Sequence, residues 1–161
     1  MNSVSEDQPR LPLDRSVGYQ IRATHRLVQR ALQARIEPHG VSLGMWYYLR
    51  VLWDRDGLTQ RELSRSIATM EPTTLSAIAA MEKEGLVRRV RNAEDKRKIN
   101  VFLTRKGRAL ETLLLPLAIE VVETATRSLT GREEDMLLGM LHAIQRDLQR
   151  DLNDPEETQA T

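Results

Sequence analysis

Helix-start and helix-stop signals follow one another so closely between residues 59 and 85 that only two short helices fit there. Thr59 and Glu62 form a capping-box pattern, which predicts a helix that begins at this threonine and runs to about residue 67. Pro72 suits the first turn of a second helix, because an N–H group at that place would have no partner. Gly85 suits the end of that helix. The sequence therefore predicts two short helices joined by a tight turn.

A basic hairpin is expected directly after these helices. Residues 87–91 and 99–103 read as antiparallel strands, and Ile99, Val101 and Leu103 alternate toward a core. The loop between the strands is NAEDKRK. A helix, a turn, a second helix and a β-ribbon in this order are the parts of a winged helix-turn-helix, in which the second helix enters the major groove of DNA.

Positive charge is concentrated in the same part of the chain. Residues 58–108 hold twelve basic and six acidic side chains, a net charge of +6; the whole chain has a net charge of only +1, so the remainder carries −5. Such asymmetry is typical of a segment that binds a polyanion, most commonly nucleic acid. A charged face that serves only solubility is the alternative. The hairpin follows two short helices immediately, and this order favours DNA.

The helix expected at 72–84 has one face of small side chains. The residues expected to face the core are Leu75, Ile78, Ala79 and Met81, and those expected on the opposite face are Thr73, Ser76, Ala77 and Ala80. A small-residue face lets a helix lie deep in a major groove, where hydroxyl groups meet base edges or phosphates and alanine meets thymine methyls. Packing of this face against another helix is the alternative. Arg61 and Arg65 on the preceding helix are better placed for phosphates than for bases.

Long amphipathic helices surround this element. Apolar residues at three-and-four spacing predict dimerisation helices within 14–37 and 105–152, and Ser42 caps the first helix of a winged helix-turn-helix at 42–104. The long helices need a partner, and a two-fold homodimer would present two recognition helices to successive major grooves. The fold class is therefore mainly α with a small antiparallel β-wing, in one domain at 13–152. The polar ends, 1–12 and 153–161, are expected to be mobile tails.

The chain lacks the sequence patterns of several other chemistries. It has no cysteine, which excludes disulfides and thiolate metal sites. Its three histidines lie on separate expected elements, and no phosphate-binding loop or nucleophile elbow occurs, so we predict no metal, no cofactor, no catalytic residue and no enzyme activity. No stretch approaches the roughly 18 apolar residues of a membrane span, and the start lacks a signal-peptide pattern. We expect a cytoplasmic protein without membrane contact.

Three stretches resemble the MarR family of bacterial transcriptional regulators, named for multiple antibiotic resistance. They are GLTQRELS at 57–64, MEKEGLVRR at 81–89 and DKRKINVFLTRKG at 95–107, the last of which looks like the family's D-x-R wing signature. The resemblance implies a helical homodimer that binds pseudo-palindromic operators, usually as a repressor released by a small ligand. It also implies that Arg97 enters the minor groove, where negative potential concentrates, and that Asp95 holds this arginine or the neighbouring backbone in place.

Pattern and resemblance together give a set of expected DNA-binding residues. They are Arg61, Arg65, Thr73, Thr74, Ser76, Ala77, Arg89, Asp95, Lys96, Arg97 and Lys98.

The resemblance also implies a ligand site between the dimer layer and the DNA-binding lobe. The residues that match it on the first and second helices are Arg22, His25, Arg26, Met45, Trp46, Tyr47 and Arg50. An indole, a tyrosine and nearby cations suit an aromatic acid or its bulkier CoA thioester. The alternative is that Trp46 and His25 are packed structural residues, which is the commoner role of such side chains. Because the chain has no cysteine, we expect ligand binding rather than peroxide sensing as its input.

The leading hypothesis is thus a ligand-responsive repressor that binds double-stranded DNA as a homodimer. Two other functions stay open from the sequence alone. One is a ligand-independent architectural DNA-binding protein. The other is a helical interaction bundle whose basic ribbon binds an acidic protein.

Overall fold

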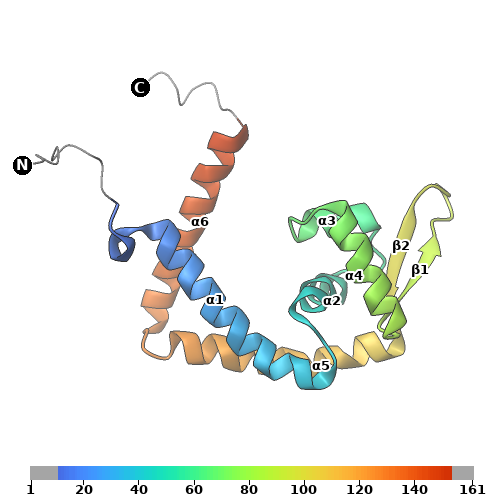
Figure 1. Ribbon diagram of the computed structural model, residues 1–161, viewed down its shortest axis with the longest axis horizontal. Helices are drawn as coiled ribbons and strands as arrows, with labels where there is room; N and C mark the ends of the chain where they lie inside the picture. Colours follow the sequence, from blue (N-terminus) through green and yellow to red (C-terminus); the bar gives the residue numbers. More distant parts are fainter. Residues whose placement is uncertain (1–10, 154–161) are drawn as a thin grey trace, which may run out of the picture. The chain divides into compact units, whose positions relative to one another are not determined.

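The computed structural model describes residues 11–153, and the parts of the expected tails at 1–10 and 154–161 lie outside the described residues. Six α-helices, two strands and two short 3-10 helices follow one another (Figure 1) in the order η1 Leu13–Arg15, α1 Val17–Ile36, η2 Glu37–His39, α2 Leu43–Asp54, α3 Gln60–Ser66, α4 Glu71–Lys83, β1 Val87–Arg91, β2 Ile99–Leu103, α5 Arg105–Thr126 and α6 Gly131–Asn153. The prediction of a mainly α fold with an antiparallel wing is confirmed. The chain divides within α5 into two compact units, Met1–Val121 and Val122–Thr161.

Four side chains cap helices, and two of them, Ser42 and Thr59, lie where the sequence predicts a helix start. Ser16 and Ser42 accept hydrogen bonds from the backbone N–H groups of the third helical residues, at 3.3 Å in both cases. Thr59 forms a full capping box with Glu62: each side chain accepts a hydrogen bond from the other residue's backbone N–H, at 3.2 and 2.8 Å. Thr130 begins α6 in the same way, through Glu133. Local capping therefore explains where these helices begin.

Two backbone hydrogen bonds close the turn between α4 and β1. Gly85 adopts a left-handed conformation with φ of 69°, which a side chain would strain. Its N–H donates to the Glu82 carbonyl at 2.9 Å, and the Leu86 N–H donates to the Met81 carbonyl at 2.8 Å. These two bonds form a Schellman motif, so the helix ends at a defined residue and the chain enters β1 at once.

The wing is a two-stranded antiparallel hairpin beside α4 (Figure 1). β1 and β2 pair in a register that places Val87 opposite Leu103 and Arg91 opposite Ile99. Val101 on β2 is buried and contributes to the core of the first unit. Its neighbour Asn100 forms an isolated bridge with Thr59, which extends the hairpin toward the start of α3. The wing is therefore joined to the helix-turn-helix at its base.

The core of the first unit joins α2, α4, the wing and the start of α5. Its members include Leu49, Leu52, Ile78, Met81 and Leu114, all with 0 or 1% of their surface exposed. Fully burying side chains of this size stabilises a fold by about 1.5–3 kcal/mol each, before entropy costs are counted. This core fixes α4 against α2.

The rotation of α4 about its axis differs from the prediction. Thr74, Ile78 and Met81 face the core, whereas Leu75 is 45% exposed and Ala79 is exposed. Thr74 is buried without an energetic penalty because the Tyr48 hydroxyl donates a hydrogen bond to its Oγ1, at 3.1 Å. The partner lies 26 residues away along the chain, so the spacing of apolar residues in α4 gives no sign of it.

The second unit contains the end of α5 and the whole of α6. Residues 131–153 form one continuous helix with no buried side chain, and Met136, Met140 and Leu148 each expose more than half of their surface. Within residues 11–153, no helix combines the length and apolar character needed to cross a membrane.

Candidate nucleic-acid interface

The wing tip is built around Asp95. Its Oδ1 accepts hydrogen bonds from the backbone N–H and the Nε of Arg97, both at 3.1 Å, and its Oδ2 accepts one from the Arg97 guanidinium at 3.4 Å. The hydrogen bonds from Arg97 hold the pKa of the Asp95 carboxyl below its usual range. The Arg97 side chain is nevertheless 91% exposed. The tip therefore presents a fixed guanidinium to solvent.

Asn92 shapes the loop that carries this pair. Its Oδ1 accepts hydrogen bonds from the backbone N–H groups of Glu94 and Asp95, both at 2.9 Å, and its Nδ2 donates to Asn100 at 2.9 Å. An asparagine bonded in this way to the backbone two and three residues ahead forms a turn without a helix or strand. This turn-forming role of Asn92 was not predicted, although an asparagine directly after a strand is a turn signal.

The outward face of α4 consists of small residues, as predicted for three of its four members. Thr73, Ser76 and Ala80 are exposed, and the Ser76 hydroxyl donates to the Pro72 carbonyl at 3.1 Å. Ala77 is half-buried against the core. Thr74 was predicted to contact DNA, but its surface is completely buried. We therefore correct that assignment: Thr74 holds α4 to α2 through Tyr48.

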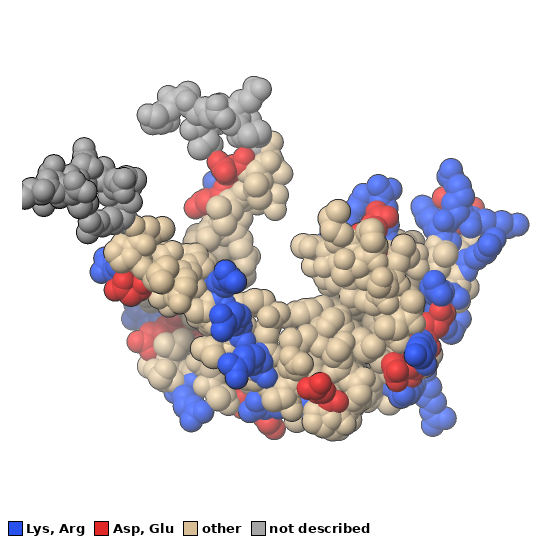
Figure 2. All heavy atoms as spheres, in the orientation of Figure 1, with Lys and Arg blue, Asp and Glu red and all other residues tan. Residues whose placement is uncertain are grey.

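The other basic residues predicted to contact DNA differ in their exposure and in whether they pair with a carboxylate. Arg61 lies 3.5 Å from the Glu71 carboxylate, and both side chains are largely exposed. Arg65 is exposed near the end of α3. Lys98 lies 3.9 Å from Asp95, whereas Arg89 binds Glu82 with a shortest N–O distance of 2.7 Å. Figure 2 shows the basic side chains gathered over the wing tip, beside few acidic ones.

The base of the wing is tied to the loop between α2 and α3. The Asp56 carboxylate accepts hydrogen bonds from the Leu103 N–H at 2.9 Å, the Gly57 N–H at 3.0 Å and the Arg108 guanidinium at 2.7 Å. The Asn100 side chain donates to the Gly57 carbonyl at 2.7 Å. This link could not be predicted from local sequence, because Asp56 meets partners 47 and 52 residues further along the chain.

A cavity of about 400 Å³ lies between α1, α2 and α4. Of the predicted ligand residues, only His25 and Tyr47 line it. The other polar groups at its surface are mostly uncharged amides and hydroxyls, from Gln29, Tyr48, Thr69 and Thr73. Thr73 and Ala77 belong to α4, so one wall of the cavity is formed by the helix that we expect to enter the major groove.

The remaining predicted ligand residues lie elsewhere. Arg22 and Arg26 line a smaller cavity of about 190 Å³ beside Tyr19 on α1. Trp46 is 5% exposed and packs edge-to-face against Trp53, with ring centroids 5.6 Å apart. It is a core residue rather than a cavity wall. Met45 is half-buried against the same core.

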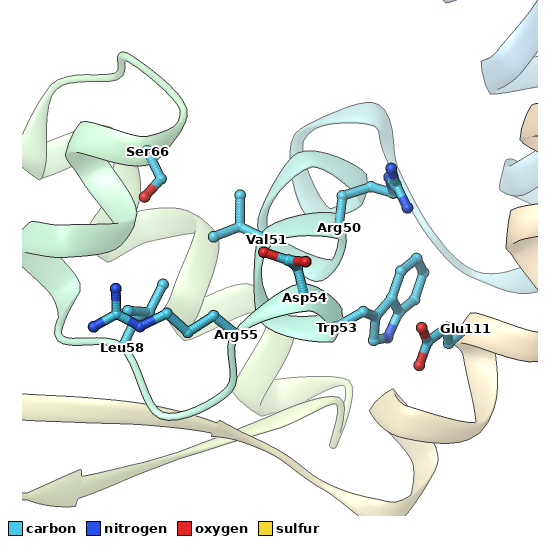
Figure 3. A pocket seen from close by; sticks show the side chains of 8 residues that line it. All are labelled: Arg50, Val51, Trp53, Asp54, Arg55, Leu58, Ser66 and Glu111. Carbon is cyan, nitrogen blue, oxygen red and sulfur yellow. The ribbon is translucent and has the colours of Figure 1, made fainter.

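Arg50 lies at a third and larger cavity of about 690 Å³, on another side of α2 (Figure 3). Two arginines and two acids line it, and Trp53 forms part of its wall, fixed by a hydrogen bond from its Nε1 to the Gly107 carbonyl at 3.0 Å. Figure 3 shows Arg50, Trp53 and Glu111 at one end and Arg55 with Ser66 at the other. The charges balance and their side chains are mostly exposed, so the lining favours neither anions nor cations.

Comparison with known proteins identifies this architecture. The model of the MarR family matches residues 41–99, which run from just before α2 through the wing tip. The crystal structure of a MarR transcriptional regulator from Methanosarcina mazei Go1 is 30% identical, with a TM-score of 0.77 over 83% of this chain and 96% of that chain. The chain belongs to the MarR family.

Other MarR-type proteins are more distant in sequence. The HTH-type transcriptional regulator TtmR of Methylorubrum extorquens is 29% identical over 69% of this chain, although the alignment spans only 56% of TtmR. A mutant of MarR from E. coli, crystallised in complex with operator DNA, is 22% identical and has a TM-score of 0.76 over 80% of this chain and 92% of that one. These MarR relatives are transcriptional regulators, so the prediction that the chain is not an enzyme agrees with its family.

Proposed function

We propose that this MarR-family transcriptional regulator binds double-stranded DNA, with α4 in the major groove and the wing tip in the adjacent minor groove. The observation that carries the proposal is the Asp95–Arg97 pair at the tip. A guanidinium that is exposed but already oriented loses less conformational entropy on binding than a free one. The narrow minor groove is where DNA's negative potential is strongest, which suits an inserted arginine. The small, exposed face of α4 supports the same docking.

The protein acts as a homodimer in this proposal. Several apolar side chains of α6 are exposed within residues 131–153. Exposed apolar patches of this kind mark association surfaces. A two-fold dimer pairs the two recognition helices with the half-sites of a pseudo-palindrome. We infer repression as the regulatory outcome and the cytoplasm, where bacterial DNA lies, as the place of action.

The effector in this proposal is a small aromatic ligand bound in the His25 cavity. A volume of about 400 Å³ falls in the usual range for small-ligand sites and favours an aromatic acid over its bulkier CoA thioester. His25 is the one ionisable cation at its surface, and the tyrosine, threonine and glutamine groups suit a hydroxyl or carboxyl substituent. Because α4 forms one wall, a ligand that displaces this wall would move the recognition helix.

The test is selection of duplexes from a random library, followed by comparison of the affinity for the selected and for scrambled duplexes at the same salt concentration. We expect the selected duplex to bind about 10³-fold more tightly or better. Equal affinity for both duplexes supports the architectural alternative. Absence of binding even at low salt, where phosphate contacts are strongest, refutes DNA binding and leaves the interaction bundle.

A further inference from the structure

Glu82 on α4 and Arg89 on β1 are joined by hydrogen bonds and an ion pair. Glu82 Oε1 accepts a hydrogen bond from the Arg89 backbone N–H at 3.1 Å, and Oε2 accepts one from Arg89 Nε at 2.9 Å. The Arg89 Nη2 lies 2.7 Å from the same Oε2. One carboxylate thus binds both the main chain and the side chain of a strand residue, with the geometry of strong charge-assisted bonds. We refer to this pair as the Glu82–Arg89 clamp.

The clamp holds one strand while other contacts hold its partner. Asp56 and the Gly57 carbonyl bind β2, through Leu103 and Asn100. Within residues 11–153, the clamp supplies the side-chain hydrogen bonds between α4 and β1, and the backbone link is the short turn at Gly85. Its loss would leave the β1 side of the wing attached to α4 mainly through that turn and through packing.

We propose that the Glu82–Arg89 clamp is a positioning device that sets the distance between the recognition helix and the wing-tip arginine on DNA. This inference rests on the DNA-binding function proposed above. Arg89 is then a positioning residue, because two of its three guanidinium nitrogens, Nε and Nη2, are already bound to Glu82. The earlier expectation of a direct DNA contact by Arg89 changes accordingly.

The size of the effect follows from the length of the wing. β1 continues two residues beyond Arg89, about 7 Å at the usual rise, and the loop lies beyond it. A rotation of roughly 20° at the clamp would move a tip 10–15 Å away by about 3.5–5 Å. Neighbouring base pairs lie about 3.4 Å apart along the helix axis. A loosened wing would therefore reach the wrong base step.

A charge argument separates this role from a direct contact. Removing an acidic side chain beside a DNA-binding surface normally strengthens binding to a polyanion. If Arg89 contacted a phosphate, Glu82→Gln would free that arginine and tighten binding. The clamp requires the opposite, so the sign of the change decides between the two roles.

The experiment measures the affinity of Glu82→Gln, Arg89→Gln and the double variant for the duplex that the wild-type protein selects. We expect each single variant to bind about 5- to 10-fold more weakly and the double variant to bind no more weakly than either, because both substitutions break one interaction. The slope of affinity against salt should stay unchanged in Glu82→Gln. Glu84→Gln is the matched control: this neighbouring glutamate is exposed, and within residues 11–153 only its backbone groups, not its carboxylate, make hydrogen bonds. It should bind as tightly as the wild type or slightly more tightly.

A second duplex with one base pair inserted between the major-groove and minor-groove parts of the site tests the spacing directly. The wild-type protein should lose about tenfold in affinity on the insertion, and Glu82→Gln should lose less than about threefold. Unchanged or tighter binding by Glu82→Gln, or a salt slope lowered by about one in Arg89→Gln alone, would overturn the clamp and assign Arg89 to a phosphate.

Hydrogen exchange in the free protein keeps the two proposals distinguishable. The Arg89 amide should exchange at least tenfold faster in Glu82→Gln than in the wild type, because its acceptor is weakened. An unchanged rate refutes the clamp even if the protein binds DNA. If the wild-type protein binds no DNA at all, the proposed function fails, and with it the clamp's role in DNA spacing, whatever the exchange rate.

Discussion

At the scale of single residues, one buried hydroxyl adds to the core packing that holds α2 against α4. Tyr48→Phe removes the donor to the buried Thr74, so we expect a loss of about 1–2 kcal/mol in the free energy of unfolding, measured in urea. Tyr47→Phe is the control, since Tyr47 is 37% exposed and only accepts a 3.3 Å bond from Gln29. It should cost less than about 0.5 kcal/mol. Equal losses in the two variants would contradict a special role for the buried bond.

At position 107, the surrounding atoms leave no room for a side chain larger than that of glycine. A Cβ atom there would collide with the Leu86 carbonyl, which cannot yield because the Thr104 N–H and hydroxyl both donate to it. Gly107→Ala should therefore cost about 2–3 kcal/mol or more. Gly131→Ala, where nothing lies within 4 Å of the added atom, should be neutral within about 0.5 kcal/mol. Thermal melting of both variants decides, and similar melting temperatures would refute the collision.

At the scale of elements, the capping box of α3 makes stability depend on pH. The backbone N–H of Thr59, and then its hydroxyl, hold the pKa of Glu62 below its usual range. A lowered pKa in the folded state stabilises the fold above about pH 5, and this contribution disappears as the pH falls through the lowered value. Glu62→Gln should thus be less stable than the wild type by about 0.5–1 kcal/mol at pH 7.

The difference between Glu62→Gln and the wild type should shrink as the pH falls through the lowered pKa of Glu62, as measured by urea unfolding at several pH values. Glu94→Gln is the control, because the Glu94 carboxylate makes no hydrogen bond or ion pair that the structure records within residues 11–153. A constant difference between Glu62→Gln and the wild type over this pH range would contradict the linkage.

The elements also show how far local sequence signals reach. Helix starts at Ser42 and Thr59 were predictable because a cap acts within one turn of the helix it begins. The Asp95–Arg97 pair was expected from the resemblance to the MarR family, and its members lie two residues apart. The rotation of α4 was not predictable, because it depends on a hydroxyl on another helix.

The predicted ligand site was also affected by contacts between residues that are far apart in the sequence. Seven residues were placed together from two helices, and the structure divides them among cavities and the core. Helical spacing shows which residues share a face, but it does not show what each face packs against.

At the scale of the whole molecule, the proposed dimer should be visible in solution. Sedimentation should give a mass near twice 18.4 kDa. Met140→Asp places a charge among the exposed apolar residues of α6 and should shift the protein toward the monomer, while helix content by circular dichroism stays the same. A wild-type monomer at micromolar concentration would contradict the dimer.

The central claim is that Arg97 carries the wing's contact with DNA, and the salt dependence of binding tests it most directly. The measurement compares wild type, Arg97→Ala and the control Arg30→Ala, an exposed arginine of α1, on the selected duplex from low to high salt. We predict that Arg97→Ala weakens binding at least tenfold and lowers the slope of log affinity against log salt by about one, whereas Arg30→Ala changes neither. Equal affinity and slope for Arg97→Ala and the wild type would contradict the account.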